Sequence, residues 1–169
     1  MKVFKDFPTE RPVTSFLDNI ESPEDLKKLT IDELEVLADE LREYLLYSVR
    51  QTGGHFGAGL GAIEITIALH YLLDMPSDKI VWDTGHQAYP HKILTGRRDK
   101  MHLMRKIDGL AAFPSIKESE FDAMSVGHSS TSISAALGMD EASKHQKNNK
   151  NIFSVIGDGA MTAGIAFEA

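Results

Sequence analysis

Cysteine is absent from the 169-residue chain, and tryptophan occurs only once. Without cysteine there is no disulfide framework and no thiolate chemistry, and a cytoplasmic protein is the expected class. No run of about 18 apolar residues occurs, so we expect no membrane-spanning segment and no membrane partner. Acidic residues outnumber basic ones by 25 to 18, and the net charge of −7 gives no general attraction to nucleic acid. Any phosphate site must therefore be built locally.

The composition that remains is ordinary for a globular protein, with 42% hydrophobic and 25% charged residues. Its length predicts one domain with a real core. Residues 1–21 contain Pro8 and Pro12 and show little periodicity, which predicts an extended N-terminal arm. We expect the domain itself to cover residues 22–169.

Two helices are predicted in the first half of the chain. Thr30 and Glu33 form a capping-box pattern, and apolar residues from Leu34 to Val49 recur at helical spacing. The acids on the opposite face of this long helix are interpreted as a solvated surface: Glu35, Asp39, Glu40 and Glu43. Ala62–Leu73 predicts a second, strongly apolar helix. Five glycines lie between the two helices in residues 51–61, typical of a loop that approaches a ligand closely.

A strand, a glycine turn and a helix start follow one another near the end of the sequence. Asn151–Ile156 predicts a buried strand, Gly157–Asp158–Gly159 ends it, and Ala160–Ala169 predicts a helix. Free N–H groups at such a junction can bind an anion, and Asp158 offers a hard oxygen ligand for magnesium. The triplet alone is also typical of an ordinary turn, and with Gly164 it could be a loose dinucleotide-binding loop.

Further strands are predicted at Lys79–Asp83 and Met124–Val126. The predicted fold class is therefore α/β, with a mainly parallel sheet, helices on both faces, and the strands near Ile80, Val126 and Phe153 side by side. Carboxyl ends of parallel strands meet at one edge. We expect that edge to bring together the residues that follow the strands, namely His86, Gly127, His128 and Asp158.

Three histidines each follow a glycine in a predicted loop: His55, His86 and His128. Because one such histidine means little but three share a setting, we interpret them as one site. The remaining four are interpreted more plainly, with His70 as a core residue, His91 as a possible support for the His86 loop, and His102 and His145 as surface. The spacing does not favour a zinc site.

These segments resemble the N-terminal domain of the 1-deoxy-D-xylulose-5-phosphate synthase family. The similar motifs are Thr52–His55, Trp82–Lys92, Leu94–Arg98, Gly127–Ser134 and Gly157–Thr162. The resemblance covers the chain from about Arg11 to Ala169, and Trp82–Arg98 distinguishes it from transketolases of other specificity.

The resemblance implies a thiamine diphosphate and Mg2+ enzyme, homodimeric at full length, that decarboxylates pyruvate and joins the two-carbon unit to D-glyceraldehyde 3-phosphate. By motif, it implies Asp158 as a metal ligand, and His55 and His86 as catalytic residues. The residues implied for cofactor binding are His86, Gly127, His128, Ser129, Gly159 and Ala160. Histidines near neutral pH can give and take protons in such a reaction.

One departure from the family pattern affects the expected activity. The family places an asparagine metal ligand roughly 25 to 30 residues after the aspartate, and its activating glutamate lies in a further domain. Neither is in this sequence, so we expect a fragment that is inactive alone. The alternatives are a non-catalytic piece that binds cofactor or pairs with other subunits, or a transketolase of other specificity.

Overall fold

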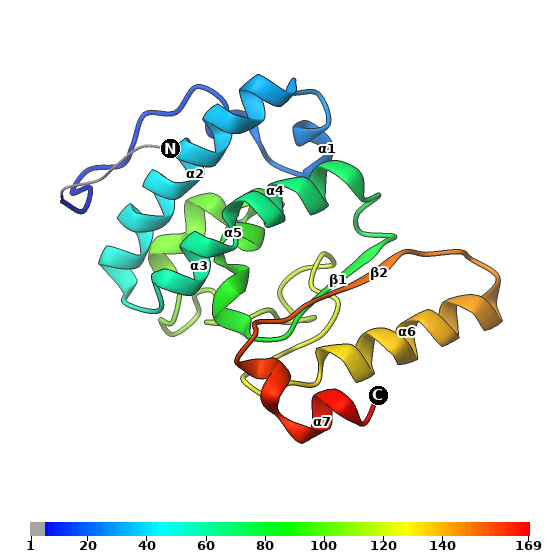
Figure 1. Ribbon diagram of the computed structural model, residues 1–169. Helices are drawn as coiled ribbons and strands as arrows, with labels where there is room; N and C mark the ends of the chain where they lie inside the picture. Colours follow the sequence, from blue (N-terminus) through cyan, green and yellow to red (C-terminus); the bar gives the residue numbers. More distant parts are fainter. Residues whose placement is uncertain (1–5) are drawn as a thin grey trace. The chain divides into compact units, whose positions relative to one another are not determined.

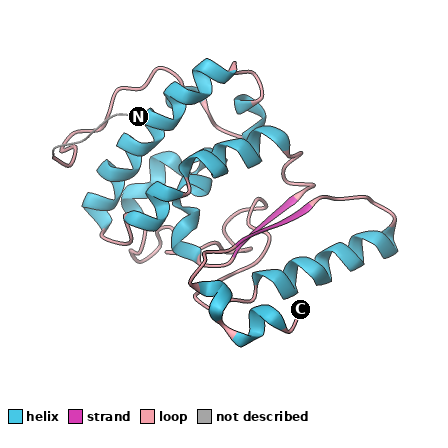
Figure 2. Cartoon of the chain, viewed as in Figure 1, coloured by secondary structure: helices cyan, strands magenta, loops and turns pink. Residues whose placement is uncertain are grey.

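The structure, a computed structural model, describes residues 6–169 and divides into two compact units. The first unit comprises the described residues up to Leu72 together with His86–Ala112, and the second comprises Leu73–Gly85 and Phe113–Ala169. Figure 1 labels the elements and Figure 2 colours them by type. In chain order they are α1 (Pro23–Leu26), α2 (Ile31–Thr52), α3 (Gly57–Gly61), α4 (Ile63–Leu72), β1 (Lys79–Trp82), α5 (Tyr89–Lys92), α6 (Ser132–Gln146), β2 (Ile152–Val155) and α7 (Gly164–Phe167).

The second unit is built on a parallel pair of strands. β1 and β2 pair from Lys79 opposite Ile152 to Trp82 opposite Val155. Their β-branched and aromatic residues favour the extended conformation, and Ile80, Val81 and Trp82 are almost completely buried. Helix α6 packs against both strands and runs beside them in Figure 1. The predicted α/β class, with parallel strands near Ile80 and Phe153, is confirmed.

Two local predictions in this unit are wrong. Met124–Val126 forms no strand. The strand-like pairing nearby is an isolated antiparallel bridge between Thr84, which follows β1, and His128. The predicted helix from Ala160 to Ala169 is interrupted. A 3-10 turn at Ala160–Thr162 ends at Ala163, whose ψ of 137° is extended, before α7 begins. The Thr162 hydroxyl donates to the Gly159 carbonyl at 2.7 Å, a local bond that competes with helix continuation.

The first unit is helical, and α2 supplies the central part of its core. Thr30 caps α2 through the predicted capping box with Glu33. The apolar stripe of α2 is buried, and the helix packs against α4 and α5. A cluster of buried apolar side chains forms the core of this unit and includes Leu37, Leu41, Leu45 and Val49 from α2, Ile63 and Ile67 from α4, and Tyr89, Ile93 and Leu94 from the segment that begins with α5. The two predicted helices of the first half are confirmed.

The N-terminal segment packs closely against this helical unit. Residues 1–5 of the predicted arm lie outside the described residues, and the arm's boundary at residue 21 stays a prediction. Leu17 and Ile20, which sequence reasoning placed in the extended arm, are buried at 0% and 2% exposure. A 3-10 turn at Leu17–Asn19 brings Leu17 inward.

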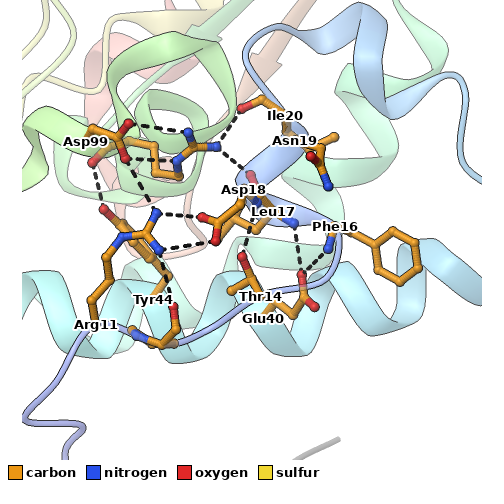
Figure 3. A network of polar contacts seen from close by, with 12 residues as sticks. Arg11, Thr14, Phe16, Leu17, Asp18, Asn19, Ile20, Glu40, Tyr44 and Asp99 are labelled. Carbon is orange, nitrogen blue, oxygen red and sulfur yellow. Dashed lines mark hydrogen bonds and ion pairs between the residues drawn. The ribbon is translucent and has the colours of Figure 1, made fainter.

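Glu40 holds the backbone of this segment, as Figure 3 shows. Its carboxylate accepts hydrogen bonds from the N–H groups of Ser15 at 2.5 Å, Phe16 at 3.0 Å and Leu17 at 2.9 Å. The sequence analysis interpreted Glu40 as part of a solvated surface. That interpretation is wrong, because the side chain binds the backbone of the N-terminal segment. The spacing could not reveal this role because the donors lie 23 to 25 residues earlier.

Arg98 binds the same N-terminal segment through hydrogen bonds to two backbone carbonyl groups of that segment. Arg98 is 5% exposed, and its guanidinium donates to the carbonyl oxygens of Leu17 at 2.5 Å and Ile20 at 3.0 Å. The Tyr44 hydroxyl of α2 in turn donates to the Arg98 carbonyl at 2.9 Å. At the edge of this network Arg11 forms a bidentate pair with Asp18, which lowers the pKa of that carboxyl group.

We predict that Glu40→Ala lowers the free energy of unfolding by about 2 kcal/mol, because three backbone N–H groups lose a charged acceptor. Urea denaturation measures this change. Glu35→Ala, on the exposed face of the same helix, is the matched control and should change stability by less than about 0.5 kcal/mol. Equal effects of the two substitutions would contradict the anchoring role.

Candidate functional site

The polar groups of the second unit gather at one edge of its sheet. Because β1 and β2 are parallel, their carboxyl ends share an edge. Asp83, Thr84 and Gly85 follow β1 there, and the turn containing Asp158 follows β2. Thr84 bridges to His128, and the Gly85 N–H donates to the Gly127 carbonyl at 3.1 Å. The structure therefore places Gly127, His128 and Asp158 at the edge where the sequence predicted them.

The turn after β2 offers backbone donors and an exposed carboxylate. Met161 N–H donates to the Gly157 carbonyl at 3.1 Å and Thr162 N–H to that of Gly159 at 3.2 Å. The N–H groups of Asp158 and Gly159 have no hydrogen-bond partner among the described residues. A Cβ at Gly159 would meet nothing within 4 Å. An anion and a divalent cation fit this combination of open backbone, free N–H donors and the exposed Asp158 oxygen.

The segment before α6 carries exposed polar side chains. His128 and Ser129 are exposed, and the Ser129 and Thr131 hydroxyls lie 2.9 Å apart. The Phe113 ring meets the His128 ring edge-on, with the ring centres 5.2 Å apart. Phe113 also covers Gly85, where a Cβ would lie 2.5 Å from its ring. Only glycine therefore fits at position 85.

In the first unit the structure brings together the two histidines predicted to be catalytic. The His55 and His86 rings stack with their centres 4.3 Å apart and an interplanar angle of 22°. His55 is exposed in the loop after α2, and His86 lies in a 3-10 turn at Gly85–Ala88. Stacked rings direct their nitrogen atoms outward from the stack, where they can meet polar groups.

The glycine-rich loop beside His55 passes close to the side chain of Tyr89, and its predicted approach to a ligand stays a prediction. Gly53 and Gly54 have φ angles of +67° and +130°, which side-chain-bearing residues rarely adopt. A Cβ at Gly54 would lie 2.8 Å from the hydroxyl of Tyr89. That hydroxyl is buried and has no hydrogen-bond partner in the described part of the chain. Sequence reasoning did not single out Tyr89, although it lies three residues after His86.

Two buried histidines support the helix that follows His86. His70 of α4 and His91 of α5 are fully buried, and His70 Nε2 lies 2.8 Å from His91 Nδ1. His70 Nδ1 lies 2.7 Å from the Thr66 carbonyl, which can only accept, so Nδ1 carries the proton. Nε2 of neutral His70 must then accept from His91 Nδ1–H. The prediction of His70 as a satisfied core residue is confirmed, and His91 bonds it to α5.

Burial disfavours the charged form of His70. Desolvation, assisted by the nearby His91, lowers its pKa from 6.5 to about 3, although the bond to Thr66 opposes the shift. The sequence placed His70 in an apolar helix but could not identify its partner, because His91 lies 21 residues later.

The fold and the polar edge define a class of protein. An α/β unit whose glycine turn and polar loops follow the ends of parallel strands is typical of enzyme domains that bind phosphate-bearing cofactors. No helix of the described residues is long and apolar enough to cross a membrane.

Comparison with known proteins identifies the family. A family model described as 1-deoxy-D-xylulose-5-phosphate synthase matches residues 17–169. Three relatives are named 1-deoxy-D-xylulose-5-phosphate synthase. Those of Pseudomonas savastanoi pv. phaseolicola and Pseudomonas syringae pv. tomato are 65% identical to this chain, and that of Ectopseudomonas mendocina is 63% identical, each over 166 residues. The chain belongs to the 1-deoxy-D-xylulose-5-phosphate synthase family. The matches cover 98% of this chain and 26% of each relative.

We predict an acid-sensitive stability from His70. Its folded pKa of about 3 lies below the unfolded value, so its contribution is complete above about pH 6.5 and is lost as the pH falls toward 3. Between pH 7.5 and 5.5 this one group should cost about 1.4 kcal/mol. Urea denaturation at both pH values tests this, with His70→Leu expected to lose that part of the pH dependence. His102→Gln, at an exposed position, should keep it, and an unchanged dependence in His70→Leu would refute the assignment.

Proposed function

We propose that this chain provides the diphosphate-binding part of 1-deoxy-D-xylulose-5-phosphate synthesis. In that reaction pyruvate is decarboxylated and its two-carbon unit is joined to D-glyceraldehyde 3-phosphate. Thiamine diphosphate and Mg2+ are the proposed cofactors, and a cytoplasmic homodimer is the proposed form of the whole enzyme. The observation that carries the proposal is the exposed Asp158 turn at the sheet edge it shares with Gly127 and His128, in a chain that belongs to this family.

Asp158 and its turn have the chemistry to hold a magnesium diphosphate. An aspartate beside a diphosphate would repel it, so a divalent cation between them is needed. In the proposed arrangement the Asp158 carboxylate would hold the cation, and the N–H groups near Gly159 and Ala160 would bind the phosphate. Gly159 allows the backbone to approach because no side chain lies in the way.

The segment before α6 would contact the rest of the cofactor. His128 and Ser129 are exposed, and Gly127 has open space where a side chain would stand. An imidazole and a hydroxyl can both donate and accept hydrogen bonds. When bound, thiamine diphosphate supplies the electron sink for decarboxylation, while the protein supplies orientation and electrostatics.

His55 and His86 are the proposed catalytic residues. Their rings are held against each other, which limits the rotation of both side chains. A neutral imidazole can donate a proton to an oxygen that gains negative charge and take the proton back when the carbonyl re-forms. His86 would also contact the cofactor. Ring contact of this kind would favour proton transfer, because an oriented general acid needs little reorganisation.

We predict that Asp158→Asn weakens the magnesium-dependent binding of thiamine diphosphate at least tenfold, because a neutral amide is a poorer ligand for a hard cation. Isothermal titration calorimetry of the chain with cofactor, with and without Mg2+, measures the change. Asp140→Asn, on the surface of α6, is the matched control and should leave binding unaltered. An Asp158→Asn chain that binds like the wild type would remove Asp158 from the metal site.

Activity is tested in an exchange of segments. Residues 17–169 of this chain replace the matching segment of the full-length Pseudomonas savastanoi relative, which is 65% identical. We expect the exchanged enzyme to form 1-deoxy-D-xylulose 5-phosphate, and His55→Ala or His86→Ala in it to lower kcat at least 100-fold with little change in Tm. His145→Ala, on the exposed end of α6, serves as the control. A correctly folded exchanged enzyme without activity would refute the proposed function.

A further inference from the structure

Asp83 is a buried carboxylate that the proposed function does not use. It follows β1 directly and is 2% exposed. Its backbone N–H donates to the Val155 carbonyl at 2.9 Å, which continues the pairing of the two strands. Its side-chain oxygen Oδ2 accepts the N–H of Ser132, the first residue of α6, at 3.0 Å. Asp83 therefore joins the start of a 15-residue helix to the end of the sheet.

The segment that leads into α6 is fastened on both sides of its exposed residues. At its beginning, Gly127 accepts the Gly85 N–H and His128 bridges to Thr84. At its end, Ser132 is bonded to Asp83 through its N–H. The Ser132 hydroxyl accepts from the Ser154 hydroxyl of β2 at 2.7 Å. His128 and Ser129 lie between these fixed ends.

Helix capping alone does not explain Asp83. Caps normally come from the residue just before the helix, but Thr131 makes no such bond here and the acceptor lies 49 residues earlier in the chain. The second oxygen of Asp83, Oδ1, is buried without a hydrogen-bond partner within residues 6–169. Burying a carboxylate oxygen in this way costs stability. A hydroxyl side chain at the N-cap position itself could cap α6 without the destabilising burial of a carboxylate, but it would not connect the helix to the end of β1.

We propose that Asp83 is a positioning residue, which holds Gly127–Ser132 against the carboxyl ends of β1 and β2 so that His128 and Ser129 are placed for the cofactor. Its negative charge lies at the positive end of the α6 dipole, which strengthens the bond to Ser132. The part of this inference that concerns the cofactor rests on the proposed function. The placement of the segment stands on the hydrogen bonds alone.

Amide hydrogen exchange followed by NMR tests the placement without any cofactor. Asp83→Ala should speed the exchange of the Ser132 and Gly85 amides at least tenfold. The Lys79 amide, which bonds to Asn151 in the strand pairing, should keep its protection. Asp83→Asn retains one oxygen acceptor and should restore much of the protection, and it serves as the second variant if Asp83→Ala does not fold. Unchanged exchange at Ser132 and Gly85, or an equal loss at Lys79, would overturn the positioning role.

Calorimetry with thiamine diphosphate and Mg2+ then tests the consequence. Asp83→Ala should weaken cofactor binding at least tenfold, and Asp83→Asn should bind within threefold of the wild type. Changed exchange with unaltered affinity would overturn the link to the cofactor. If the wild-type chain itself bound no cofactor, the proposed function and this link would both fail, while the exchange data would still decide the placement of the segment.

Discussion

The pairing of Trp82 with Val155 determines where the polar groups of the second unit lie. Parallel strands that end in register release their chains on the same side, so two loops separated by about 70 residues of sequence emerge at one edge. The Asp83 N–H extends the pairing by one more bond, to the Val155 carbonyl. A shift of β1 by one residue would turn Asp83 to the opposite face and break its bond to α6. The exact register is therefore a condition for the site.

In the first unit, loops are held by charged side chains, of which Lys92 and Arg98 are buried and Glu40 is half-buried. Arg98, Glu40 and Lys92 each direct a charged side chain at backbone groups, and the Lys92 ammonium donates to the Ala111 carbonyl at 2.9 Å. Charge-assisted bonds of this kind are strong, and losing one partner leaves a buried charge or an unpaired peptide group. They fix loops that have little apolar surface of their own. The turn that contains His86 lies directly before α5, the helix that carries Lys92.

The sequence predicted the parts of the fold that depend on local pattern. The capping box at Thr30, the apolar stripe from Leu34 to Val49 and the short strands around Ile80 and Phe153 all follow from residue type and spacing. The contacts of Glu40 and Arg98 could not be predicted, because their partners lie 23 to 81 residues away and a carboxylate or guanidinium looks alike in the sequence whether it is exposed or buried.

Within each unit, the structure brings together some of the candidate site residues that follow a glycine. His55 and His86 do stack, and the Gly127–His128 segment does reach the sheet edge that carries Asp158. Their roles in catalysis and binding stay proposals. Tyr89 and Asp83 were missed although both lie inside the Trp82–Lys92 motif. The available signal for Asp83 was its position directly after a predicted strand. A carboxylate that is buried there needs a hydrogen-bond partner, so the position itself pointed to a structural contact.

Charge explains why the proposed cofactor would need its metal here. The chain carries a net charge of −7, and the sheet edge contributes two carboxylates, one buried at Asp83 and one exposed at Asp158. The positive end of α6 is already occupied by the Asp83 carboxylate, so this helix has little attraction left for a second anion. A diphosphate at this edge would meet the free N–H groups of the β2 turn and the exposed carboxylate of Asp158. In the proposed site a divalent cation held by Asp158 would offset the repulsion between this carboxylate and the phosphate oxygens, which is the physical reason for proposing magnesium together with the diphosphate.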